Sequence, residues 1–186
     1  LVGSEMCIRD SFTTLSSCAS RQLEEVTFRR ATISVPELMA TAGKYFRKVY
    51  KGNKAHIDFK IQPLEGRITG DWNQLRFLLE NLIDEACSVT LDGAVCLSAR
   101  EDGEFIRFLF TDMRREKTRE ELNQLFYPDL SRMTAGEKGE LYGTEYLVCK
   151  QIIRDHDEFA GRRGCRINAE PGKEGGFTIY FTLPKK

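Results

Sequence analysis

Residues 70–89 read GDWNQLRFLLENLIDEACSV, and this stretch decides the fold. Asp71 is a favourable N-cap residue, because its carboxylate can accept hydrogen bonds from the free N–H groups of a first helical turn. The apolar residues that follow recur at the spacing of one helix face: Leu75, Leu78, Leu79, Leu82 and Ala86. The stretch therefore predicts a long amphipathic helix from Trp72 to about Val89.

Strands are predicted on both sides of this helix, from apolar and polar residues in alternation and from turn residues at the ends. In residues 56–62, for example, Ile57, Phe59 and Ile61 share one face. The predicted strands cover residues 31–34, 56–62, 67–69, 94–101, 104–111, 165–170 and 177–183. The fourth and fifth of these strands are joined at Asp102-Gly103, a favourable two-residue hairpin turn.

Helices are predicted between the strands. Ser34 is followed by Pro36 and Glu37, a capping hydroxyl with a proline and an acid in the first turn, so a helix is expected from there to about Gly52. Further helices are expected at 118–125 and 144–159. This order predicts an α+β domain, a two-layer α/β sandwich whose mixed sheet is covered on one face by helices. Its expected core residues are Ile57, Phe59, Leu75, Leu78, Leu82, Phe108, Phe110, Ile152, Ile179 and Phe181.

The composition excludes several classes of protein. The chain has 186 residues, enough for one domain with an appended arm, and its 28 basic and 28 acidic residues give no net charge. Nothing in this balance indicates a nucleic-acid binder, and no apolar run has the length of a membrane span. The six cysteines form no C-x-x-C pair, which argues against a zinc site and suits a reducing, cytoplasmic environment.

Three regions are expected along the chain. Residues 1–10 do not join smoothly to the sequence after them, and we interpret them as a non-native terminus. Residues 11–28 carry one apolar stripe and predict a linker helix, which would be the tail of a dimerisation hairpin in a longer protein. Residues 29–186 are expected to form the folded domain.

Five short motifs follow one another in a fixed order. They read GDWNQL (70–75), NLIDEA (81–86), FLFTD (108–112), GTEYLVCKQII (143–153) and GGFTIYFTLP (175–184). From about residue 28 to residue 184 the chain resembles the ATP-binding domain of sensor histidine kinases. These belong to the GHKL superfamily, which they share with gyrase, a heat-shock chaperone and a mismatch-repair protein. The resemblance implies the Bergerat ATP-binding fold, a mixed five-stranded sheet covered on one face by about three helices, with ATP and Mg²⁺ as cofactors.

The second motif resembles the N box of this family. Asn81 and Glu85 are four residues apart, so both side chains project from the same helix face towards one ligand. In the family an asparagine at the position of Glu85 holds a magnesium ion that bridges the phosphates. The resemblance therefore implies that Asn81 and Glu85 bind the cofactor and that Glu85 is the metal ligand, since a carboxylate oxygen can also bind Mg²⁺.

Three more nucleotide-binding positions are implied by the resemblance. Asp112 stands where the family's aspartate accepts a hydrogen bond from the adenine amino group. Gly143 matches the first glycine of the second glycine box, and Glu145 replaces the next one. Phe177 stands where the family keeps a threonine or serine that supports the adenine contact, and its ring is expected to fill that corner.

The first glycine box departs furthest from the family pattern. Both of its glycines are absent, since Arg114 and Glu116 stand at their positions, and side chains there add bulk where the backbone normally approaches the nucleotide. Glu85 and Glu145 add negative charge beside the expected phosphates. Four basic residues lie in or near the loop that would cover the triphosphate and are expected to offset part of this charge: Arg114, Arg115, Arg132 and Lys138.

Two hypotheses about function follow from these departures. The first is a degenerate nucleotide site with weak or no catalysis, in a pseudo-ATPase that serves as a signalling module. The alternative is an active catalytic domain that phosphorylates a histidine on an upstream domain; His56 and His156 are expected to be structural. The implied partners are an upstream sensor or dimerisation domain and a response regulator. Residues 113–142 are expected to be the least ordered segment, like the family's ATP lid.

Overall fold

The computed structural model describes residues 27–127 and 144–186, with the side chains of residues 144 and 145 outside the description. The predicted linker helix at 11–28 therefore lies almost wholly outside the described residues, as do residues 1–10, Gly143 and most of the segment expected to be least ordered. Within the described residues, no helix combines the length and the hydrophobicity that crossing a membrane requires. The elements in chain order are β1 (Ala31–Ser34), α2 (Val35–Tyr50), β2 (Ile57–Gln62), β3 (Arg67–Gly70), α3 (Trp72–Ser88), β4 (Gly93–Asp102), β5 (Phe105–Asp112), α4 (Arg119–Gln124), α5 (Thr144–Phe159), β6 (Ile167–Pro171) and β7 (Phe177–Pro184).

The main sheet has five strands in the order β2-β4-β5-β7-β6. β2 runs parallel to β4, and the other neighbours are antiparallel, so the sheet is mixed as predicted. The short strand β3 pairs with β1 in a separate two-stranded sheet, although it follows directly on β2 in the chain. β6 and β2 are the two edges of the main sheet.

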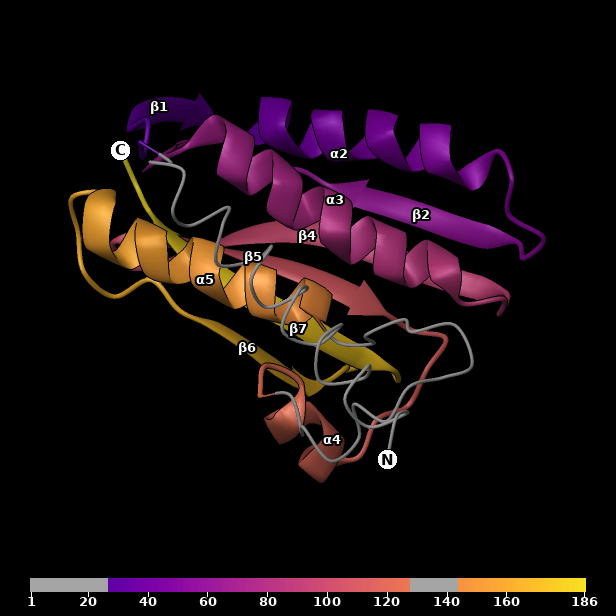
Figure 1. Ribbon diagram of the computed structural model, residues 1–186. Helices are drawn as coiled ribbons and strands as arrows, with labels where there is room; N and C mark the ends of the chain where they lie inside the picture. Colours follow the sequence, from indigo (N-terminus) through magenta and orange to yellow (C-terminus); the bar gives the residue numbers. More distant parts are fainter. Residues whose placement is uncertain (1–26, 128–143) are drawn as a thin grey trace, which may run out of the picture.

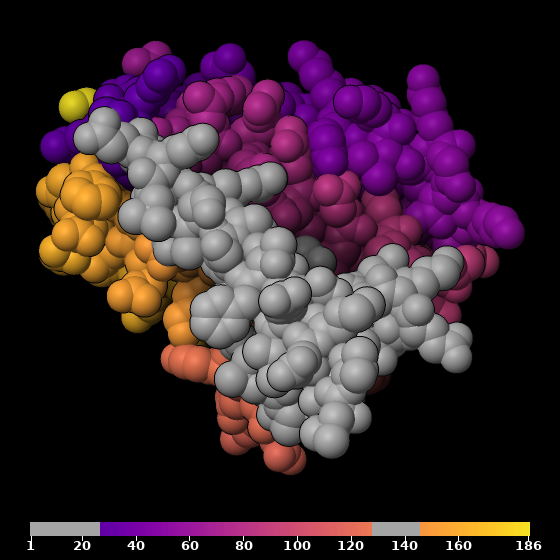
Figure 2. Space-filling view, in the orientation of Figure 1, coloured from indigo at the N-terminus to yellow at the C-terminus, as the bar shows by residue number. Residues whose placement is uncertain are grey.

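The helices α2, α3 and α5 cover one face of the main sheet (Figure 1). Figure 2 shows the same side as a surface, on which atoms of α2 and α5 flank those of α3. Each of the two long helices whose start is fully described begins at the predicted cap. The Ser34 hydroxyl accepts from the N–H of Glu37, and the Asp71 carboxylate accepts from the N–H groups of Asn73 and Gln74. Satisfying these N–H groups fixes where the helices begin.

The core lies between the helices and the sheet. Nine of the ten predicted core side chains are buried, and the tenth, Phe59, is partly buried and stacks on Phe46 of α2 with 4.5 Å between ring centroids. Phe108 and Phe181, on neighbouring strands, stack face to face at 5.0 Å. The predicted fold, an α+β two-layer sandwich with a five-stranded mixed sheet, is confirmed. This framework places the C-terminal half of α3 beside the end of β5 and the start of β7.

Candidate functional site

The predicted site residues of the helix lie on its C-terminal half. The side-chain N–H of Asn81 donates to the carbonyl of Phe77, at 2.7 Å, one turn back on the same helix. Glu85, one turn further on, is partly buried and points towards the residues that come after β5. The amide N–H of Asn81 is therefore bonded within α3, and of the two N-box side chains Glu85 is the one that reaches across to the turn after β5.

Asp112 is the last residue of β5, and its side chain has no exposure to solvent. Its Oδ1 accepts hydrogen bonds from the backbone N–H and the Nε of Arg114, at 3.0 and 2.8 Å. Its Oδ2 accepts from Nη2 of Arg114 at 2.8 Å and from Nε of Arg115 at 3.0 Å. Burial opposes ionisation, but the hydrogen bonds from Arg114 and the charge of Arg115 outweigh it and lower the pKa of Asp112.

The side chain of Arg114 is buried as completely as the side chain of its partner Asp112. Beyond the carboxylate, its guanidinium donates to the carbonyl of Ala86 at 2.7 Å, in the last turn of α3, where carbonyls lack helical partners. It also donates to the carbonyl of Leu91 at 3.1 Å, in the loop after the helix. Gly93 makes room for it, since a Cβ on that residue would lie 2.9 Å from the Arg114 Cγ. Arg114 thus ties the end of α3 to the end of β5. From the sequence, we expected Arg114 only to add bulk at a glycine position and to offset negative charge.

Arg115 forms a two-pronged ion pair with Glu85. Nη1 donates to Oε1 at 2.8 Å and Nη2 donates to Oε2 at 2.7 Å, so both carboxylate oxygens are engaged. The side chains are only 15% and 20% exposed, so solvent weakens the pair less than it would a surface pair. Burial disfavours the charged guanidinium, but the hydrogen bonds and charge of Glu85 outweigh this and raise the pKa of Arg115.

Two aromatic residues complete the surroundings of this ion pair. Phe177, the first residue of β7, is opposite Asp112 in the sheet register and is buried. The guanidinium carbon of Arg115 and the Nζ of Lys117 each lie 5.2 Å from the centre of its ring, so the ring serves as a platform for two cations. Tyr146 of α5 is buried nearby, and burial together with the charge of Glu85 raises the pKa of its hydroxyl.

The turn before β7 is held tightly against the end of β5. Gly176 has a φ of +69°, and a Cβ there would lie 2.0 Å from the carbonyl oxygen of Asp112. Its N–H donates to Oε1 of Glu116 at 3.0 Å. Glu116, which the sequence suggested only as an obstruction, therefore anchors the start of β7. Gly143 lies outside the described residues, so its predicted role stays a prediction.

The acceptor groups expected to bind a nucleotide and a metal are already bonded within the protein. Both oxygens of Asp112 and both oxygens of Glu85 accept hydrogen bonds from Arg114 or Arg115. An adenine amino group at Asp112, or a Mg²⁺ ion at Glu85, would need these bonds to break first. In this arrangement the residues present do not fit ATP and Mg²⁺. The two arginines were the part of the site that sequence reasoning missed, although a buried acid at position 85 calls for a cation nearby.

Comparison with known proteins places this geometry in a family. Residues 70–186 match the family described as histidine kinase-, DNA gyrase B-, and HSP90-like ATPase. The match covers well over half of the chain, and it includes α3, the turn after β5 and the closing strand β7. The chain belongs to this family.

A sensor kinase and several kinase catalytic domains are similar to the chain. It is 30% identical, over 138 residues, to the adaptive-response sensory kinase SasA of Thermosynechococcus vestitus; these residues are 73% of the chain and 34% of that kinase. The chain thus spans about a third of the length of this relative.

Among solved structures, the nucleotide-free catalytic domain of the histidine kinase ThkA superposes with a TM-score of 0.65 at 19% identity, over 84% of this chain and 96% of that domain. Full-length ShkA in complex with AMPPNP gives 0.65 at 17% identity, over 87% of this chain and 32% of that one. At these identities the two structures support the fold alone.

Proposed function

We propose that the chain is the ATPase-type domain of a sensor histidine kinase whose nucleotide site is occupied by its own arginines, so that it acts as a signalling module with weak or no catalysis. The observation that carries the proposal is the full engagement of Asp112 by Arg114 and Arg115. The residue that resembles the family's adenine acceptor has two N–H donors on each carboxylate oxygen, and it is inaccessible to solvent.

The energetics favour the internal partner over a nucleotide. Releasing Asp112 from Arg114 would leave a guanidinium buried without a carboxylate partner, and breaking a buried ion pair in this way costs about 3–5 kcal/mol. A cost of about 4 kcal/mol corresponds to roughly three decades of binding affinity. Arg114 would in addition lose its bonds to the carbonyls of Ala86 and Leu91, so the end of α3 would have to rearrange.

The metal position supports the same proposal. The position of Glu85 resembles that of the family's magnesium-binding asparagine, and here a guanidinium neutralises its charge. A guanidinium paired in two-pronged fashion with a carboxylate is a strong and geometrically specific partner. Mg²⁺ is reluctant to lose its bound water and takes only a few protein ligands, so it competes poorly for a carboxylate in such a pair.

The partners follow from the length of the relatives. Because the chain spans about a third of SasA, we propose that the natural protein carries further domains. These include an upstream sensor or dimerisation domain, with a response regulator as the downstream partner and the cytoplasm as the location. The domain would then transmit a signal through its contacts with these partners, without turning over ATP.

Thermal unfolding with Mg-ATP tests the proposal. A ligand present at 100 times its Kd stabilises a protein by about 2.7 kcal/mol, which a melting curve detects easily. We expect millimolar Mg-ATP to leave the melting temperature unchanged. Asp112→Asn should lower the melting temperature, because it removes the charge that pairs with Arg114, and it should not alter the response to ATP. Asp58→Asn is the matched control, since Asp58 is exposed and its ion-pair partner among the described residues is the exposed Lys60.

A contrary result would favour the active alternative. If Mg-ATP stabilises the wild type by several degrees and Asp112→Asn abolishes that gain, Asp112 binds adenine. Arg114 and Arg115 would then have to leave the site when the nucleotide enters, and the chain would be an ATP-binding catalytic domain.

A further inference from the structure

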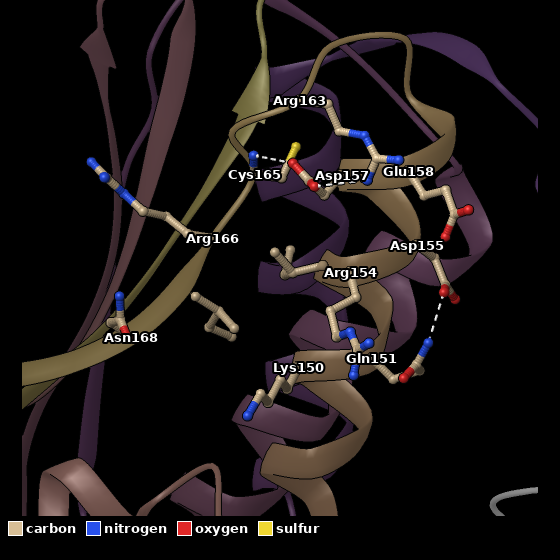
Figure 3. Close-up of a pocket in the computed structure, with 12 residues that line it drawn as sticks. Lys150, Gln151, Arg154, Asp155, Asp157, Glu158, Arg163, Cys165, Arg166 and Asn168 are labelled. Atoms are coloured by element: carbon tan, nitrogen blue, oxygen red, sulfur yellow. Dashed lines mark hydrogen bonds and ion pairs between the residues drawn. The ribbon is translucent and has the colours of Figure 1, made fainter.

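A hollow of about 510 Å³ lies between α5 and the edge strand β6, away from Asp112 and the arginines that bind it. Figure 3 shows Lys150 and Arg154 along α5, with Arg166 and Asn168 across from them on the β6 side. Ile153 and Ile167, from the same two elements, give the hollow an apolar part. The side chains of β6 belong to none of the five family motifs, and they take no part in the ion pairs of Arg114 and Arg115.

Two of the cations on this surface have no described acid as an ion-pair partner. Lys150 and Arg154 form no ion pair with a described carboxylate; the Nζ of Lys150 lies 3.5 Å from the centre of the Tyr127 ring. Arg166 reaches Asp102 only at 3.9 Å. Two cations one helical turn apart on one face repel each other, an arrangement that an acidic partner would relieve.

The acids that also line the hollow are directed elsewhere. Asp155 accepts a hydrogen bond from Gln151 at 2.8 Å, and in Figure 3 it lies with Glu158 on the side of the helix away from β6. Asp157 pairs with Arg163 and accepts from the N–H groups of Gly164 and Cys165, so it holds the loop that leads into β6. The side of α5 that faces β6 is therefore cationic.

The backbone of β6 lies beside these cations, and α4 comes close to the C-terminal end of the strand (Figure 1). β6 is an edge of the main sheet, and among the described strands it pairs only with β7. The N–H of Arg166 donates to Oγ1 of Thr182, and the N–H of Thr182 donates to the carbonyl of Arg166, so Arg166 faces β7. Since successive residues of a strand point their backbone groups in opposite directions, the N–H and C=O groups of Ile167 and Ala169 face outwards.

We propose that this groove binds an extended acidic segment of a partner protein, which adds as a sixth strand beside β6. Backbone hydrogen bonds from Ile167 and Ala169 would give the affinity, as in other cases of strand addition. Side chains of the added strand that point towards α5 would lie beside Ile167, which is partly exposed, and carboxylates at the ends would reach Lys150 and Arg154. Carboxylates on the other face of the added strand would meet Arg166.

The probe for this proposal is a fluorescein-labelled heptapeptide, Glu-Asp-Val-Glu-Val-Asp-Glu, with blocked ends. Its first, third, fifth and seventh side chains share one face, so two valines flanked by glutamates would point towards α5. We expect binding to the 186-residue chain with a Kd below 1 mM. Amide hydrogen exchange at Ile167 and Ala169 should slow when the peptide is bound, because both N–H groups become donors.

One change to the protein and one change to the peptide separate the contribution of charge from that of the backbone hydrogen bonds. The charge reversal Lys150→Glu/Arg154→Glu should weaken binding at least tenfold. The matched control, Lys44→Glu/Lys48→Glu, makes the same charge change at the same spacing on an exposed part of α2 and should bind like the wild type. A peptide that is N-methylated at alternate residues keeps its charge but loses its edge donors, and it too should bind at least tenfold more weakly.

Three results would overturn the proposal. The first is no binding up to 1 mM. The second is equal weakening by the two charge reversals, which would indicate attraction to the whole surface. The third is full binding of the N-methylated peptide, which would show a polyanion site without strand addition.

Discussion

The Nε2 atom of His156 accepts a hydrogen bond from the backbone N–H of Asp71, with 3.0 Å between the two nitrogens across 85 residues of sequence. The other ring nitrogen, Nδ1, lies 2.8 Å from the carbonyl of Ile152 and donates to it, because Nε2 is the acceptor. The ring is fully buried, and Gly70 lies against it so closely that a Cβ there would be 2.9 Å away. A neutral imidazole thus joins the end of α5 to the start of α3.

The stability of the domain should therefore fall in mild acid. Burial lowers the pKa of His156, and the bond to Ile152 and the charges of Asp71 and Asp155 only partly offset this. The folded state then binds fewer protons than the unfolded state, so the stability is complete above about pH 6.5 and is lost as the pH falls below it. The loss from one such group approaches about 1.4 kcal/mol per pH unit, and urea unfolding at several pH values measures it.

His156→Gln is the informative variant for this pH dependence. An amide can accept from Asp71 and donate to Ile152 without titrating, so the variant should lose stability overall but show a flatter profile between about pH 6.5 and 5. Asp112 and Asp157, whose pKa values are lowered, lose their contributions only near and below the ordinary carboxyl range. An unchanged slope in the variant would show that another group titrates in this window.

Gly176 should be the glycine least tolerant of substitution in the turn before β7. An alanine there would combine a left-handed φ of +69° with a Cβ 2.0 Å from the Asp112 carbonyl oxygen. The conformation alone costs about 1–2 kcal/mol, and the required backbone shift adds about 1–3 kcal/mol. We expect Gly176→Ala to lower the free energy of unfolding by about 2–5 kcal/mol in urea titrations.

Gly103→Ala separates the cost of the left-handed backbone conformation from the cost of the steric clash. Gly103 has a similar φ of +60°, but a Cβ there would meet nothing within 4 Å. Its substitution should cost only the conformational part, about 1–2 kcal/mol. Equal effects of the two substitutions would mean that the turn before β7 moves away from β5 without cost.

The fold could be predicted from the sequence because its signals are local and repeated. Period-2 alternation marked Ile57 and Phe59 as one face of a strand, and the Asp71 cap marked the start of α3. The pairing of β3 with β1 could not be read in this way, because each strand has only four residues and carries too little alternation to select a partner. That choice depends on how α2 and α3 pack together, which only the folded chain determines.

The sequence indicated which of the candidate site residues would lie together, but it did not indicate how they bond to one another. The motif order indicated that Glu85, Asp112 and Phe177 would lie together, and the structure brings all three to Arg115. What the residues do for one another depends on rotamers of two long arginine side chains. Motif spacing says nothing about those rotamers, so Arg114 and Arg115 were expected to face phosphates when in the structure they face Asp112 and Glu85.

The Arg115–Glu85 pair should contribute coupling energy that a double-mutant cycle can measure. Glu85→Ala leaves Arg115 with Asp112 and Phe177, and Arg115→Ala leaves a partly buried carboxylate without its cation. For contacting residues in one network the coupling is typically about 0.5–3 kcal/mol, and two-pronged geometry with low exposure favours the upper half. Urea unfolding of the wild type, both single variants and the double variant gives the value.

A second double-mutant cycle, on an exposed ion pair, gives a reference value for that coupling energy. Lys185 and Glu101 form a single, exposed ion pair at 3.0 Å, for which about 0–1 kcal/mol is expected. If the Arg115–Glu85 coupling does not exceed that of Lys185–Glu101, the arginine does not hold the site closed.

Restoring the family residues should reveal whether the internal arginines block nucleotide binding. Glu85→Asn supplies a neutral metal ligand, Glu145→Gly removes an acid from the first turn of α5, and Phe177→Thr opens the adenine corner. An uncompensated acid about 5 Å from a phosphate costs roughly 1–3 kcal/mol at an effective dielectric constant near 20. The triple variant should therefore bind Mg-ATP more tightly than the wild type, and Arg115, released from Glu85, could then face the phosphates.

The recovery should remain partial while Arg114 holds Asp112. Adding Arg114→Gly to the triple variant removes the guanidinium from both oxygens of Asp112 and leaves only the backbone N–H of residue 114 on Oδ1. An adenine amino group could then reach Asp112, and we expect at least a further tenfold gain in affinity by calorimetry. Arg162→Gly is the control fourth substitution, because Arg162 is exposed and pairs with Glu104 far from the site. The explanation fails if the wild type binds Mg-ATP tightly and the triple change weakens it, since the site would then have rebuilt its nucleotide chemistry around Glu85 and Phe177. It fails equally if Arg162→Gly raises the affinity as much as Arg114→Gly, because release of Asp112 would not be the cause.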